Sequence, residues 1–154
     1  MARVVSLFLP RWPTDRLRRN AGTSMPPADQ PLVLAGRVGS RRIVTALDAT
    51  AQSLGLSVGM PLAKAQALIP GLAIVDADPR GDDEALERLA VWALRFSPVV
   101  AADLPDGLVI DTTGSDHLHG GEAIMLTAMI QRFAASGIEA RVAIADTWAL
   151  AHAV

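Results

Sequence analysis

The chain has no cysteine and no long apolar run. Without cysteine it can form neither disulfides nor thiolate metal sites. Charged residues or prolines interrupt the apolar runs well before the roughly 20 residues that a membrane-spanning helix needs, so we expect no membrane contact. The apolar stretch at residues 4–9 is also too short for a signal peptide. These absences exclude disulfide scaffolds and membrane proteins, and we expect a cytoplasmic protein.

The distribution of charge is the first informative feature that is present, because the two halves of the chain carry net charges of opposite sign. The net charge of −2 combines residues 1–76, with nine Arg or Lys against four Asp (+5), and residues 77–154, with five Arg against twelve acidic residues (−7). A basic excess favours contact with a phosphate backbone or an acidic protein surface, and solvated helix and loop faces explain it equally well. The arginines of the first half cluster at Arg11, Arg16, Arg18, Arg19, Arg37, Arg41 and Arg42.

Hydrophobic periodicity and turn residues predict the elements of the first half. Pro10 stops the first apolar run, and Pro13 suits the first turn of a helix. We expect Gly36 and Gly39 to lie around the turn of a hairpin. The predicted segments are a strand at 3–9, a helix at 12–20, a loop at 21–31, strands at 32–35 and 42–47, and helices at 49–54 and 61–68.

The second half predicts helices that alternate with strands. Acidic residues 82–84 open an amphipathic helix, as suits the positive end of the helix dipole. The other predicted segments are strands at 72–75, 99–102, 108–111 and 140–145 and a helix at 122–135 that ends at Ser136-Gly137. Together with the first strand they predict a mixed α/β (α+β) fold, a ferredoxin-like sheet that a small lobe interrupts after its first strand.

Three segments carry a resemblance to a known family. Residues 55–65 contain Gly59-Met60-Pro61 before an Ala-rich stretch, residues 95–99 read Arg-Phe-Ser-Pro-Val, and residues 104–114 read Leu-Pro-Asp-Gly-Leu-Val-Ile-Asp-Thr-Thr-Gly. In this order and spacing they resemble the Y-family DNA polymerases, over nearly the whole chain. The resemblance implies a palm-like domain of residues 1–10 and 77–154 and a fingers-like domain of residues 11–76. It also implies thumb and little-finger regions beyond the end of this chain.

The resemblance places the family's metal-binding carboxylates at positions that are mostly changed. Phe8 stands where the first strand should carry an Asp, and Gly107 replaces the Glu of the adjacent Asp-Glu pair, so Asp106 alone remains. Nucleotide transfer by two cations needs several carboxylates that converge on them. We therefore expect no catalytic residue and no metal site.

The positions that should grip the triphosphate are changed as well. Ala49 and Gln52 stand where the fingers should carry a Tyr and an Arg, and Trp148 stands where the palm should carry a Lys. None of these side chains can neutralise phosphate, so the resemblance implies a degenerate polymerase without a cofactor.

Residues 9–16 and 114–122 resemble segments of the ImuB-like branch, the catalytically degenerate members of the family. That resemblance implies a scaffold in error-prone translesion synthesis and damage-induced mutagenesis. The implied partners are an ImuA-like protein with a RecA fold, an error-prone C-family DNA polymerase and the sliding clamp, the last through regions beyond this chain. Weak DNA contact is a further expectation, and the candidate contact residues for DNA or a partner are Arg11, Trp12, Arg16, Arg18, Arg19, Arg41 and Arg42.

Two other functions stay open. An active metal-dependent nucleotidyltransferase would have to rebuild its site from Asp103, Asp106 and a shifted acid, and it should carry a carboxylate on the first strand, where residues 3–10 have none. A plain DNA-binding fragment is limited by the net −7 of the second half, because its acidic residues repel phosphate.

Two further candidates have simpler explanations. His117 and His119 beside Asp116 look like metal ligands, but a His pair in a Gly-rich loop is more often part of a surface turn. Asp111 lies five residues after Asp106, so in a strand the two side chains face opposite ways and cannot share a cation. We expect Asp111 to hydrogen-bond the turn that follows it.

Overall fold

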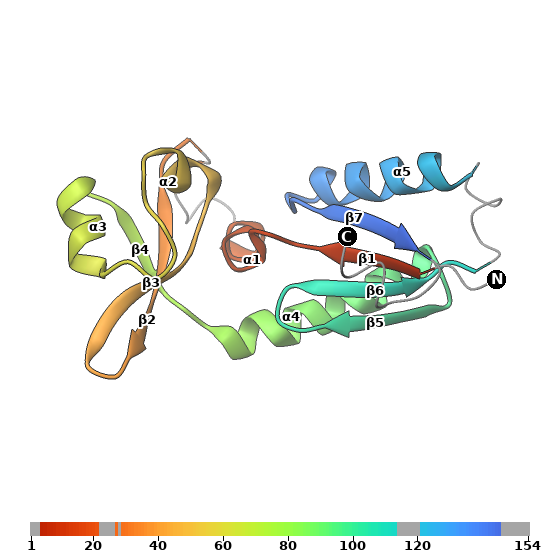
Figure 1. Cartoon of the computed structure of the whole chain (residues 1–154), viewed down its shortest axis with the longest axis horizontal. Helices are drawn as coiled ribbons and strands as arrows, with labels where there is room; N and C mark the ends of the chain where they lie inside the picture. Colours follow the sequence, from red (N-terminus) through yellow and green to blue (C-terminus); the bar gives the residue numbers. More distant parts are fainter. Residues whose placement is uncertain (1–3, 22–26, 28, 114–120, 146–154) are drawn as a thin grey trace. The chain divides into compact units, whose positions relative to one another are not determined.

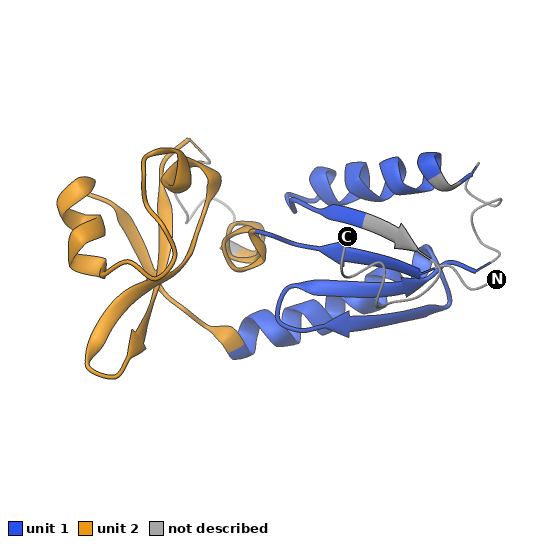
Figure 2. Cartoon of the chain, viewed as in Figure 1, with its two compact units in different colours: residues 1–10, 80–154 blue, residues 11–79 orange. Residues whose placement is uncertain are grey.

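The structure is a computed structural model that describes residues 4–21, 27, 29–113 and 121–145. It divides into two compact units, which Figures 1 and 2 show. Unit 1 comprises residues 1–10 and 80–154, and unit 2 comprises residues 11–79. The names palm and fingers for these units stay a prediction.

Unit 1 is built on a four-stranded antiparallel sheet whose strands lie in the order β5-β6-β1-β7. With its helices, the order along the chain is β-α-β-β-α-β, which confirms the predicted ferredoxin-like fold. Its elements are β1 (Val4–Phe8), α4 (Pro79–Trp92), the 3₁₀ helix η2 (Ala93–Arg95), β5 (Val99–Asp103), β6 (Gly107–Asp111), α5 (Glu122–Ala135) and β7 (Arg141–Ala145).

The two faces of this sheet differ in burial. Val5 pairs with Ile110 and Leu7 with Leu108, and all four are at most 1% exposed. Helices α4 and α5 meet at the rings of Trp92 and Phe133, whose centroids are 5.1 Å apart. Since neighbouring residues of a strand point to opposite faces, the buried Val5 face packs against the helices. The other face carries Phe8 and Val99, which are 42% and 59% exposed, and we call it the open face.

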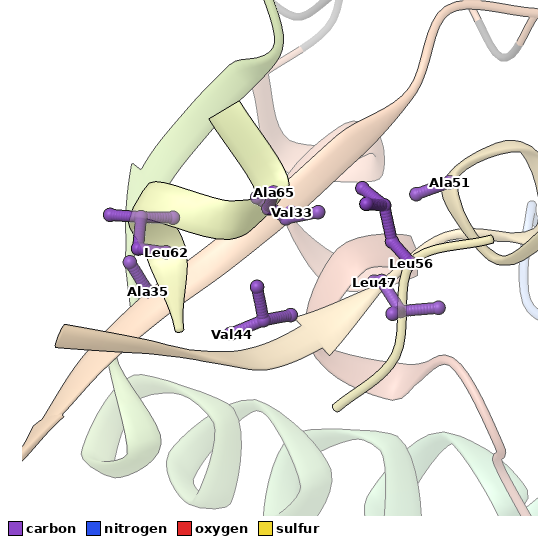
Figure 3. Packing of buried hydrophobic residues seen from close by; sticks show 8 residues of the cluster. All are labelled: Val33, Ala35, Val44, Leu47, Ala51, Leu56, Leu62 and Ala65. Atoms are coloured by element: carbon purple, nitrogen blue, oxygen red, sulfur yellow. The ribbon is translucent and has the colours of Figure 1, made fainter. Parts of the chain in front are cut away.

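Unit 2 contains a three-stranded sheet in the order β3-β2-β4, in which β2 pairs antiparallel with β3 and parallel with β4. A cluster of eight buried apolar residues packs on it, with side chains from the sheet and both short helices (Figure 3). The elements of unit 2 are α1 (Trp12–Ala21), β2 (Leu32–Val38), β3 (Arg41–Leu47), α2 (Ala49–Ser53), α3 (Leu62–Leu68) and β4 (Ala73–Asp76).

The hairpin of unit 2 is longer than the sequence predicts. Strand β2 continues to Val38, and Gly36 pairs with Ile43 inside the ladder instead of lying in the turn. A Cβ built at residue 36 would lie 2.8 Å from the Thr45 side chain, so any larger residue there would have to displace that side chain. Of the two glycines, only Gly39, with a φ of 62°, makes the turn.

The helix ends follow ordinary capping rules. Helix α4 begins at Pro79, three residues before the predicted start at residue 82, because proline fits the first turn of a helix. Gly137, with a φ of 80°, ends α5 as predicted.

Among the described residues, no helix combines the length and the apolar character that a membrane span requires.

Candidate functional site

The open face of the unit 1 sheet holds two of the three positions where the family resemblance expects metal-binding carboxylates. Phe8 of β1 pairs directly with Gly107 of β6. Asp103 of β5 pairs with Gly107, and Arg141 of β7 pairs with Phe8, so these four residues form one row across the sheet. The Phe8 side chain is 42% exposed. The centre of the row is therefore occupied by a phenyl ring and a glycine.

Gly107 is closely packed, and this limits what residue could replace it. A Cβ at residue 107 would lie 3.0 Å from the backbone oxygen of Leu7 and 3.3 Å from that of Asp103. Both atoms belong to the sheet ladder, so they can move only if the strands shift. The backbones of β1, β6 and β5 therefore pack closely at residue 107, with little room for a side chain.

Asp103 belongs to this row, whereas Asp106 and Asp111 lie outside it, one on each side of Gly107 in the sequence. Asp106 lies in the turn before β6, where its backbone oxygen accepts a hydrogen bond from the Leu9 amide at 2.8 Å. Asp111 lies four residues beyond Gly107, which is about 13 Å along a strand. Phe8 and Gly107 supply no ligand, so the row does not fit a centre of two cations about 3.5–4 Å apart, which needs several converging carboxylates. Within the described part of the chain, no three His, Asp or Glu side chains group closely enough to hold a metal ion.

Asp111 has the local role predicted for it. Its Oδ1 accepts hydrogen bonds from the Thr113 amide at 3.0 Å and from the Thr113 hydroxyl at 2.6 Å. The hydroxyl bond first, and then the amide bond, lower the pKa of Asp111 from its ordinary value. The carboxylate therefore fixes the turn after β6, as expected.

The Ser-Pro segment performs a structural task at the same end of the sheet. Ser97 is 3% exposed, and its hydroxyl donates to the backbone oxygen of Asp111. The same hydroxyl accepts a hydrogen bond from the Val99 amide at 3.1 Å. Ser97 thus links the start of β5 to the end of β6.

The Gly-Met-Pro segment also has a structural task, in unit 2. The Gly59 amide donates to the Val44 oxygen at 2.8 Å, and the Val44 amide donates to the Met60 oxygen at 2.9 Å. Pro61 forms a bridge with Ile43 and precedes α3, whose Leu62 enters the core. The segment therefore extends the sheet along the free edge of β3.

Two of the three positions expected to grip a triphosphate, Ala49 and Gln52, lie on α2. Ala49 is exposed, and the exposed Gln52 accepts a hydrogen bond at 2.5 Å from Nη2 of Arg11. Nη1 of Arg11 lies 3.5 Å from the Leu47 oxygen. A cation is thus present beside position 52, although it comes from Arg11 and is bonded within the unit.

Arg18 is committed to the interior of unit 2. Its Nη1 lies 2.6 Å from Oδ2 of the buried Asp48, and its Nη2 donates to the backbone oxygens of Pro27 and Gln30 at 3.3 and 3.0 Å. Asp48 caps α2 by accepting from the Ala51 amide at 2.8 Å, and its Oδ1 also lies 3.3 Å from the Leu32 amide. We name Arg18 and Asp48 the interior ion pair.

The other candidate contact residues divide by exposure. Trp12 is 1% exposed, so its ring offers no free face in this structure. Arg16 is 11% exposed in its side chain and lies 3.6 Å from Asp78. Arg19 and Arg41 are exposed, and Arg42 pairs with Asp76 at 2.9 Å.

One basic residue gains importance from the structure. Arg37 pairs directly with Arg42 across the hairpin, and Val38 pairs with Arg41. The sequence shows Arg37 in a basic cluster, but the predicted strand ends at Ala35, so its cross-strand partner could not be assigned. The remaining sequence candidates, Asp116, His117, His119 and Trp148, lie outside the described residues.

Comparisons with known proteins agree on one family. The sequence profile of the IMS (impB/mucB/samB) family matches residues 20–154. Protein ImuB of Caulobacter vibrioides is 53% identical over 103 residues, which cover 64% of this chain and 22% of that protein. DNA polymerase IV of Dehalococcoides mccartyi is 29% identical over 120 residues, which cover 77% of this chain and 31% of that protein. The chain thus spans less than a third of the length of these relatives.

Solved structures show the same fold. A post-insertion binary complex of Dbh DNA polymerase matches with a TM-score of 0.79 at 18% identity, covering 97% of this chain and 44% of that one. DinB from Sulfolobus solfataricus matches with a TM-score of 0.69 at 19% identity, covering 99% and 44%. The predicted mixed α/β fold of the Y-family polymerases is confirmed by this likeness.

Proposed function

The chain belongs to the impB/mucB/samB family, and from this premise we propose that it acts in translesion DNA synthesis without catalysing nucleotide transfer itself. The observation that carries the proposal is the direct pairing of Phe8 with Gly107 on the open face of the unit 1 sheet. The resemblance to Y-family polymerases expects a carboxylate at each position, and neither residue has one.

The size of the expected loss supports a non-catalytic role. Paired cations stabilise both the attacking and the leaving oxygen of a phosphoryl transfer, and they depend on converging carboxylates. Loss of even one preorganised electrostatic contact commonly lowers kcat by about 10²–10³-fold. Two missing ligands therefore leave a rate below any useful level, unless neighbouring residues replace them.

We further propose that the protein serves as a scaffold. The identity of 53% with an ImuB protein supports this role. The proposed partners are an ImuA-like protein with a RecA fold, an error-prone C-family DNA polymerase and the sliding clamp. Size-exclusion chromatography of the full-length protein with each purified partner tests the scaffold role. If no partner co-elutes with the protein, the scaffold proposal is wrong.

Primer extension tests the catalytic half of the proposal. The full-length protein is assayed on a primed template with Mg²⁺ and then Mn²⁺, beside an Asp106→Ala variant and an active DNA polymerase IV as positive control. We expect no incorporation above background from either form of this protein. Incorporation by the unchanged protein that disappears in the Asp106→Ala variant would contradict the proposal.

That second outcome would favour an active nucleotidyltransferase with a rebuilt site. One observation keeps this alternative open, because Asp103 pairs with Gly107 and so lies on the open face beside the missing ligand. An Asp103→Ala variant then separates the two functions, since only a rebuilt site depends on both Asp103 and Asp106.

A further inference from the structure

Three arginines gather at the end of the β2-β3 hairpin. Arg37 and Arg42 are directly opposite each other in the antiparallel ladder, and Arg41 belongs to the next pair. Residues 36–43 contain no acidic residue. Like charges that face each other across two strands destabilise the pair, so this arrangement needs a negative partner.

The unit itself supplies only part of that negative charge. Asp76 pairs with Ala35 in the parallel ladder, and its Oδ1 lies 2.9 Å from Nη2 of Arg42. The side chains of this pair are 43% exposed for Arg42 and 86% exposed for Asp76. Three guanidinium groups against one carboxylate leave a local charge of +2 at the hairpin end.

Two of these arginines and Asp76 line a hollow. It has a volume of about 410 Å³ and is lined by Ala35, Gly36, Arg37, Arg42 and Asp76. Alternation along the strands places Arg37 and Arg42 on one face of the hairpin and Arg41 on the other. A phosphate group can enter the hollow beside Arg37 and Arg42, while Arg41 can reach a neighbouring phosphate on the outer side.

The alternative basic surface, on helix α1, fits an external polyanion less well. Arg18 belongs to the interior ion pair, with its guanidinium on Asp48 and two backbone oxygens. Arg16 lies near Asp78 and is 11% exposed. The hairpin arginines, in contrast, carry exposed side chains on a strand end with one carboxylate among them.

We propose that the hairpin end, defined as Arg37, Val38, Arg41 and Arg42, binds the phosphate backbone of DNA. The proposal deepens the proposed function and rests on it for the choice of DNA as the polyanion. Arginine suits this task because its planar guanidinium can hold a phosphate with two hydrogen bonds. The hairpin end has no aromatic residue for stacking on bases, so the contact reads charge and not sequence.

Fluorescence anisotropy with labelled single-stranded and duplex DNA tests this surface. The chain is titrated at several salt concentrations beside an Arg37→Gln/Arg41→Gln double variant, which leaves the Arg42–Asp76 pair in place. We expect affinity to fall by about tenfold and the salt slope to fall by about two, one for each lost phosphate contact. The matched control, Arg88→Gln/Arg132→Gln, removes the same charge from exposed arginines of unit 1 and should change neither value by more than about twofold.

A third variant should raise the affinity for DNA, a change that misfolding cannot produce. Asp76→Asn removes the carboxylate that competes with phosphate for Arg42, so DNA should bind several-fold tighter. No binding by the unchanged chain, equal losses in the two double variants, or no gain in Asp76→Asn would each overturn the proposal. Displacement of the chain from DNA by polyglutamate at equal charge would point to an acidic protein instead. The primer-extension result does not enter this test, so the two proposals can fail separately.

Discussion

The two units differ in what their conspicuous residues do. In unit 1 the row where the family resemblance expects carboxylates holds Phe8 and Gly107. In unit 2 the arginines are divided between the interior and the surface. Arg18 stabilises the unit from inside, whereas Arg37 and Arg41 stay exposed.

This difference shows that a fold and its chemistry depend on different residues. The ferredoxin-like sheet needs Val5, Leu7, Leu108 and Ile110 on its covered face, and all of these are buried. The open face contributes little to that core, so its residues can change while the fold persists. Unit 2 has less freedom, because Arg18 and Asp48 connect α1, β2 and α2 with the backbone of Pro27 and Gln30.

The largest expected effect comes from breaking the interior ion pair. Asp48→Ala removes the charge partner of Arg18 and the N-cap of α2 together. Loss of one partner from a buried ion pair usually costs about 3–5 kcal/mol. The Arg18 side chain is 20% exposed, so water can replace part of the lost contact. We therefore expect the free energy of unfolding to fall by about 3 kcal/mol, the lower end of this range. Urea denaturation measures this change.

The matched control for this variant is Asp48→Asn. Asparagine is also a good N-cap, so it keeps the bond to Ala51 while removing the negative charge. It should therefore retain more stability than Asp48→Ala. Hydrogen exchange should show the loss of protection in unit 2 amides, and an equal loss throughout unit 1 would contradict the division of roles between the units.

The next effect concerns the missing ligand of unit 1. Gly107→Glu would restore the carboxylate that the family resemblance expects, yet the new Cβ would lie 3.0 Å from the Leu7 backbone oxygen. Forcing atoms into packed structure typically costs about 1–3 kcal/mol. We expect a loss of stability in this range, measured by urea denaturation, and no gain in Mn²⁺ affinity by isothermal titration calorimetry.

Gly107→Ala separates the backbone contact from the charge. It adds the same Cβ without a carboxylate, so it should show most of the destabilisation. If Gly107→Glu is as stable as the unchanged protein and binds Mn²⁺, the ladder can still accommodate a ligand and the site is closer to active than its geometry indicates.

The sequence predicted the order of elements well, because hydrophobic periodicity reports which face of each element is buried. Helix α5 was predicted with its observed bounds, and the ferredoxin-like order was confirmed. The end of β2 was missed, because a glycine such as Gly36 signals a turn more often than a closely packed strand position. The sequence also could not predict which arginines are exposed. Nothing in the neighbouring residues distinguishes Arg18, which pairs with the buried Asp48, from the exposed Arg37.

The smallest expected effect concerns Asp111 and tests whether its carboxylate stabilises the turn after β6. The bonds from Thr113 lower the pKa of Asp111 in the folded chain. A lowered pKa adds stability above the unfolded value of about 3.9, and this contribution is lost as the pH falls through the folded pKa. Asp111→Asn should cost no more than about 0.5 kcal/mol at neutral pH and should remove this part of the pH dependence. Thr113→Val, which keeps the amide donor but removes the hydroxyl, should shift the transition partway toward higher pH. Urea denaturation between about pH 2 and about pH 7 follows both variants, and unchanged pH profiles would mean that this carboxylate is not tied to the turn.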